Sequence, residues 1–136
     1  MKTTMKRRAP ALHLLAELIG GAIGALALGV ALGFAGARLF AGSSGGFGDL
    51  IGALAGMLLG CVLGASLGAY AVGLRLGTGG AYWRALLGSV LGAALVLLLA
   101  EPLRLNASPA LLQGLFAVVP PLAAALGLNL RRGIAP

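Results

Sequence analysis

The chain has 136 residues, of which 60% are hydrophobic and 10% are charged, and its mean hydropathy is +1.03. Such a composition excludes an ordinary soluble domain and leaves no stretch for a separate soluble module, so we expect one membrane-embedded domain. The formal net charge of +7 does not indicate a nucleic-acid partner, because the basic residues lie in a short tail or flank apolar segments and form no face with interleaved aromatic residues.

Four apolar segments are candidates for membrane-spanning helices, each of which needs roughly 20 apolar residues. They cover residues 14–40, 50–74, 82–100 and 109–128. The third segment ends at Glu101 and Pro102, where the proline cannot continue a helix. The predicted fold is therefore an all-α integral membrane protein, with residues 1–136 forming a single domain of four transmembrane helices.

The first segment carries small residues at a spacing of four. This row comprises Gly21, Ala25, Gly29, Gly33 and Ala37, and Gly20 and Gly24 add a neighbouring row. A cleaved signal peptide is the alternative for this segment, because a basic start, an apolar stretch and Ala25-Leu26-Ala27 match its three regions. The apolar stretch continues well beyond Ala27, and Glu17 would interrupt the hydrophobic region of a signal peptide. Both observations favour a spanning helix.

The second segment has a glycine at every fourth position. These glycines are Gly48, Gly52, Gly56, Gly60, Gly64 and Gly68. In water each interior glycine would cost a helix about 1 kcal/mol relative to alanine. In lipid the backbone must satisfy its own hydrogen bonds, so the segment still forms a helix, and the glycine stripe lets another backbone approach closely. We predict that the first two helices form an antiparallel glycine-zipper hairpin.

Two uses of this stripe remain open. It could hold the monomer together, or part of it could meet another subunit or a second copy. Six glycines are more than a single crossing needs, because helices that cross at an angle diverge after two or three turns. A nearly parallel crossing would remove the need for a second partner.

The third and fourth segments contain fewer small residues. The small residues considered are Gly88, Ser89 and Gly92 in the third segment, and Gly114 and Gly127 in the fourth. We therefore expect this half of the bundle to be packed more loosely. Pro120 and Pro121 lie in the middle of the fourth segment, where they remove two amide donors and predict a kink.

The distribution of Lys and Arg predicts the orientation, because short cytoplasmic loops carry an excess of both. The N-terminal tail, the loop between the second and third segments and the C-terminal end hold eight of the ten: Lys2, Lys6, Arg7, Arg8, Arg75, Arg84, Arg131 and Arg132. The two remaining loops hold Arg38 and Arg104 together with Asp49 and Glu101. Both termini are therefore predicted to face the cytoplasm. An interfacial aromatic belt is expected near the second cytoplasmic loop, from Tyr70, Tyr82 and Trp83.

Glu17 is the candidate for ion coupling, because an ionisable residue inside a span is a functional candidate by default. His13, one turn earlier on the same helical face, could share a proton or a hydrogen bond with it. An ion pair with Arg75 or Arg84 in the same leaflet is the structural alternative. Contact with a partner protein is the third.

The segment Ala16-Glu17-Leu18-Ile19-Gly20 resembles the first-helix segment around the coupling glutamate of small multidrug resistance transporters, which are also short four-span proteins. Leu128-Asn129-Leu130 is loosely similar to the end of their fourth helix. The resemblance covers these two short patches and implies an ion-coupling role for Glu17. The glycine run of the second segment, Arg84 beside Trp83, and the proline pair depart from the family pattern, so membership does not follow.

No other residues suggest catalysis or a bound cofactor. One histidine, one cysteine and three acidic residues cannot provide a metal cluster with ligand spacing. No serine has the histidine and acid required for nucleophilic catalysis, and no Gly-Lys-Ser/Thr follows the glycine runs. Cys61 is expected to be a small packed or lipid-facing side chain. We expect no enzymatic activity, no metal and no cofactor.

The sequence thus predicts a small, non-catalytic, multi-pass protein of a bacterial cytoplasmic membrane. The expected role is that of an accessory or scaffold subunit that packs against other membrane helices. A proton- or cation-coupled transporter using Glu17, and an oligomeric pore, are the alternatives. The expected partners are the lipid bilayer and either another membrane protein or further copies of the chain.

Overall fold

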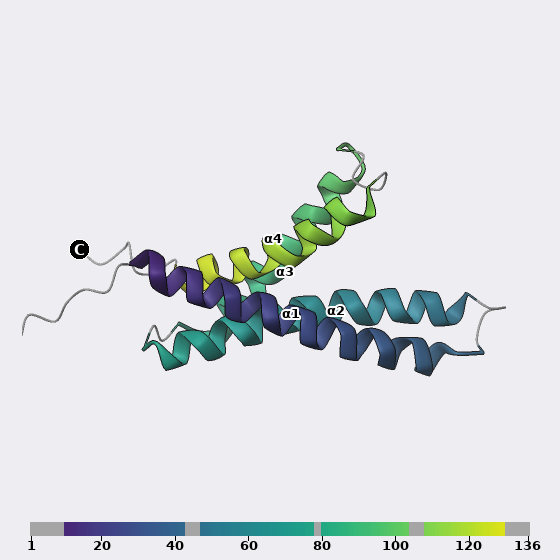
Figure 1. Ribbon diagram of the computed structural model, residues 1–136, viewed down its shortest axis with the longest axis horizontal. Helices are drawn as coiled ribbons and strands as arrows, with labels where there is room; N and C mark the ends of the chain where they lie inside the picture. The colour runs from purple at the N-terminus through teal and green to yellow at the C-terminus, as the bar shows by residue number, and fades with distance from the viewer. Residues whose placement is uncertain (1–9, 43–46, 78–79, 104–107, 130–136) are drawn as a thin grey trace, which may run out of the picture.

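The computed structural model describes residues 10–42, 47–77, 80–103 and 108–129, and it is built of α-helices. The helices are α1 (Pro10–Phe40), α2 (Gly48–Arg75), α3 (Tyr82–Ala100) and α4 (Pro109–Asn129) (Figure 1). Each is long and apolar enough to cross a membrane. The predicted all-α architecture with four spanning helices is confirmed, and the chain is a multi-pass membrane protein.

The helix boundaries follow the apolar segments with small extensions. α1 begins four residues before the predicted start and so includes His13, and α2 extends by two residues at its start and one at its end. α4 runs continuously through Pro120 and Pro121, whose side chains are fully buried.

The four helices form two antiparallel hairpins, α1 with α2 and α3 with α4 (Figure 1). The start of α1, the end of α4 and the connection from α2 to α3 lie at the same end of the molecule. We call it the basic end, after its arginines. The two hairpins pack against each other toward this end and then diverge. We call the other end, where they lie apart, the open end.

Small side chains form the contact between the hairpins. The buried cluster near the basic end contains Ala69 of α2, Ala85 of α3, and Ala124 and Leu128 of α4, with Tyr70 packed against it. Small residues allow close van der Waals packing, which must drive helix association where lipid offers no hydrophobic gain.

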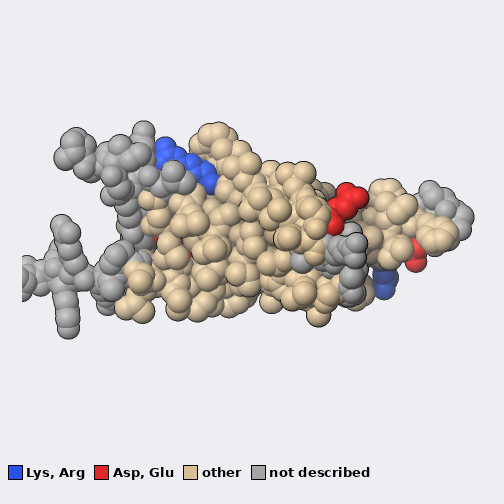
Figure 2. Space-filling model, turned by 90° about the horizontal axis from the view of Figure 1, so that it is seen from above, with Lys and Arg blue, Asp and Glu red and all other residues tan. Residues whose placement is uncertain are grey.

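The outer surface of the bundle is apolar. On the face shown in Figure 2, the middle of the molecule is mostly uncharged, and the charged groups lie near the helix ends. Large side chains such as Phe34, Leu91 and Leu98 are more than half exposed, as expected for helices that contact acyl chains.

Candidate functional site

The α2 glycines lie directly on the backbone of α1. A Cβ at any of five α2 positions would lie closer to an α1 carbonyl oxygen than real Cβ atoms do. The pairs of α2 glycine and α1 carbonyl are Gly52 with Gly36, Gly56 with Leu32, Gly60 with Leu28, Gly64 with Gly24, and Gly68 with Gly20. Because each step of four along α2 matches a step of four back along α1, one register holds over roughly 24 Å of helix.

This register bears on the argument for a second partner on the stripe. The two helices run nearly antiparallel and do not diverge within the glycine run, so α1 itself covers all five glycines. Gly48, the first of the predicted glycines, is also buried at the start of α2. The number of glycines therefore gives no reason to place another subunit on this stripe.

On α1, the closest backbone contacts come from the neighbouring row, which contains Gly20, Gly24 and Gly36. In the row that starts at Gly21, Gly29 contributes its Cα, which would lie 2.7 Å from a Cβ on Gly60. Gly33 is less crowded, because a Cβ there would meet its nearest atoms at 3.5 Å. Gly21 also faces α4, where a Cβ would lie 3.0 Å from Pro121.

The α3–α4 hairpin also contains close contacts at its glycines. A Cβ on Gly88 would collide with the carbonyl of Ala123, and a Cβ on Gly127 would collide with that of Arg84. The alanines of α4 are the small partners at these positions. α3 and α4 nevertheless contact each other less extensively than α1 and α2 do, as expected for the looser half of the bundle.

Glu17 is fully buried and binds the last residue of α4. The side-chain amide of Asn129 donates a hydrogen bond of 2.5 Å to Oε2 of Glu17 and a second of 2.8 Å to the carbonyl of Ala125. The antiparallel register of α1 and α4 explains the contact: Pro121 packs on Gly21, so one turn back along α1 places Glu17 at the level of Ala125. The side chain of Asn129 reaches back one turn to this level, where it binds both the carbonyl of Ala125 and Glu17.

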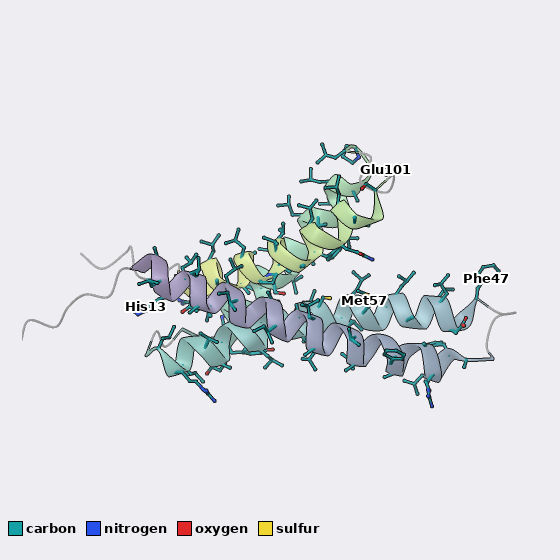
Figure 3. The ribbon with its side chains drawn as sticks, in the orientation of Figure 1. His13, Phe47, Met57 and Glu101 are labelled. Atoms are coloured by element: carbon teal, nitrogen blue, oxygen red, sulfur yellow. The ribbon has the colours of Figure 1, made fainter. Side chains whose placement is uncertain are left out.

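The partners predicted for Glu17 are different from the one observed. Within the described ranges, Glu17 accepts a hydrogen bond from Asn129, whereas His13, Arg75 and Arg84 form no hydrogen bond or ion pair with it. His13 lies half-buried near the start of α1 (Figure 3). The arginines are on α2 and α3, whereas the register brings α4 to Glu17.

Two serines and two tyrosines add polar contacts among α2 and α3. Ser89 of α3 donates a hydrogen bond of 2.8 Å to the carbonyl of Val62 in α2. Ser66 lies 3.3 Å from the hydroxyl of Tyr82, and the rings of Tyr70 and Tyr82 pack edge to face with centroids 5.4 Å apart. These contacts fasten the two hairpins together where they meet.

Beyond the region where the two hairpins pack together, α4 and α2 border the opening with different kinds of residue, small on α4 and large on α2. On α4, Ala117 and Gly114 continue the face on which Pro121 meets α1, and a Cβ on Gly114 would have no neighbour within 4 Å. On α2, Leu58 and Leu54 continue the face of Ala65. Met57 points into the opening between the hairpins (Figure 3), and its side chain is 43% exposed.

The remaining candidates for a functional role are Cys61 and possible metal ligands. Cys61 is partly buried, with its Sγ against Gly29 of α1, so it is a packed side chain. Among the described residues, no group of three His, Cys, Asp or Glu side chains could hold a metal ion.

The chain matches no protein-family model, no curated protein and no solved structure. Its resemblance to the small multidrug resistance transporters thus stays limited to the two patches around Glu17 and Asn129.

Proposed function

We propose that this chain is a non-catalytic accessory subunit in a bacterial cytoplasmic membrane. In this role it accommodates a helix of another membrane protein between its two hairpins. The observation that carries the proposal is the divergence of the hairpins toward the open end (Figure 1). A protein that only had to fold by itself could bury more surface by closing this opening, and close contact is what stabilises helices in lipid.

The chemistry of the two faces supports a helix as the occupant. Gly114 and Ala117 let another backbone approach α4 closely, and Leu54, Met57 and Leu58 offer large side chains on α2 for the other side of that helix. Because Pro121 has no N–H, the carbonyl of Ala117 has no α-helical donor. A polar side chain of the incoming helix would supply one, which favours a protein partner over acyl chains.

The first hairpin serves as the rigid part of this subunit. We propose that α1 and α2 form a glycine zipper, supported by the single register of their glycine contacts. The excess of Lys and Arg at the basic end supports an orientation with both termini in the cytoplasm.

Site-specific photo-cross-linking in native membranes tests the proposal. A photoreactive residue in place of Met57 should give an adduct with another protein. The matched control is Leu26, which is 59% exposed and lies about half a turn from Gly24, facing away from α2. Lipid adducts from both positions, with purification as a lone monomer, would overturn the proposal. An adduct between two copies of the chain would favour the oligomeric pore.

A second candidate function is proton- or cation-coupled transport, which the complete burial of Glu17 favours. The test is proton-coupled flux in liposomes: Glu17→Gln should abolish flux if Glu17 carries the proton. Flux that is unchanged in this variant would remove Glu17 from any coupling mechanism.

A further inference from the structure

Two arginines lie close to the turn that connects the hairpins at the basic end. Arg75 is the last residue of α2 and is exposed, and Arg84 lies in the first turn of α3 and is half-buried. Within the described ranges, no carboxylate forms an ion pair with either guanidinium. These two charges therefore remain available for an external anion.

The chain cannot neutralise this end with its own acidic residues. The sequence contains three, of which Glu17 is buried inside the bundle and bound by Asn129. Asp49 begins α2 and Glu101 follows α3, so both belong to the open end of their hairpins (Figure 3 labels Glu101). Among the described residues, the exposed charges at the basic end are thus those of the arginines.

Aromatic side chains accompany the arginines at the basic end. Trp83 precedes Arg84 and is 60% exposed, and the preceding residue, Tyr82, packs edge to face on Tyr70. Tryptophan and tyrosine prefer the headgroup level of a bilayer, and an arginine there extends its guanidinium toward the phosphates. A guanidinium can bind two phosphate oxygens at once.

We propose that Arg75, Trp83 and Arg84 form a surface that binds the headgroups of anionic phospholipids. The phosphate chemistry alone would also suit a free anion. The exposed ring of Trp83 lies next to Arg84 in the sequence and needs an apolar neighbour. A phospholipid supplies both the phosphate and the apolar chains, whereas a free anion supplies only the charge. The proposal does not depend on the protein partner discussed above, since that partner would occupy the open end.

Lipid retention by the intact protein tests this surface. The protein is purified from mixed micelles containing equal amounts of phosphatidylglycerol and phosphatidylcholine, and the lipids that stay bound are counted by native mass spectrometry. The parent should retain phosphatidylglycerol preferentially. Arg75→Gln and Arg84→Gln should each lower that retention by about fivefold, the usual contribution of an interfacial basic residue. Trp83→Ala should lower the retention of both lipids.

Three controls make the result decisive. Arg38→Gln removes an exposed arginine at the open end of α1 and should leave retention unchanged. The Arg→Lys variants keep the charge and should lose less than the glutamine variants, while helical content reports folding. Equal retention of the two lipids by the parent, or equal losses in the Arg38 and Arg84 variants, would overturn the proposal. Displacement of the lipid by excess inorganic phosphate would identify a free-anion site instead.

Discussion

The side-chain amide of Asn129 donates a 2.5 Å hydrogen bond to the buried carboxyl group of Glu17, which joins the last residue of α4 to the second turn of α1. This contact links the two hairpins across 112 positions of sequence. It also satisfies part of the hydrogen-bonding capacity of an acidic side chain that no water reaches, and a buried polar group without partners is costly.

Removing the amide should therefore destabilise the bundle. We expect Asn129→Ala to lower the free energy of unfolding by about 1–3 kcal/mol, because it removes a hydrogen bond from a buried carboxyl group. Reversible unfolding by sodium dodecyl sulfate measures this change. Gln113→Ala, which removes an exposed amide from the same helix, is the matched control and should have little effect. Equal stability of the two variants would show that the contact contributes nothing.

Replacing the amide by an acid should make stability depend on pH. In Asn129→Asp, two carboxyl groups would face each other at hydrogen-bond distance, and they can share one proton but cannot both ionise without repulsion. The folded state then binds more protons than the unfolded state, so stability falls as pH rises, by at most about 1.4 kcal/mol per pH unit for one proton. Thermal unfolding across a pH series should show this decline in the aspartate variant. A flat profile would mean that the two side chains move apart.

The glycine contacts predict which alanine substitutions the first hairpin accepts. Gly64→Ala should lower the free energy of unfolding by about 1–3 kcal/mol, the usual cost of overpacking, because the new methyl would collide with the backbone of Gly24. Gly33→Ala should be neutral, since its nearest atoms lie at ordinary contact distance. Unfolding in detergent compares the two. A destabilised Gly33 variant beside an unaffected Gly64 variant would contradict the register.

A cysteine can test the same register covalently. A Cβ at position 29 would lie 2.8 Å from the Sγ of Cys61, so the two sulfurs of a Gly29→Cys variant are within bonding reach. Mild oxidation should produce an intramolecular disulfide, detected by mass spectrometry of the tryptic or chymotryptic fragments. Gly33→Cys faces Met57 instead and should remain reduced. Cross-linking of the Gly33 variant with Cys61 would indicate a helix shifted by one turn.

Hydropathy and the spacing of Gly and Pro were enough to predict four helices and nearly all of their boundaries, because a bilayer requires long apolar segments and little else. The spacing could not identify which α1 row meets α2 most closely. That choice depends on the rotation of α1 about its axis, and Pro121 of α4 takes part in setting it by packing on Gly21.

The partner of Glu17 was also beyond reach of the sequence. Its nearest ionisable neighbours along the chain and in the same leaflet were His13, Arg75 and Arg84, whereas Asn129 reaches it through the register of two helices that are distant in sequence. Similarly, the bond from Ser89 to the carbonyl of Val62 joins α3 to α2 through a backbone atom, which no residue pattern reveals.

The closeness of α1 and α2 has a consequence for biogenesis. The close contacts at the glycines of this pair lie between residues 20 and 72, so they can be completed as soon as both segments have left the ribosome and entered the bilayer. The later half of the chain would then assemble on the completed hairpin, with Asn129 of α4 making a connection back to the first helix.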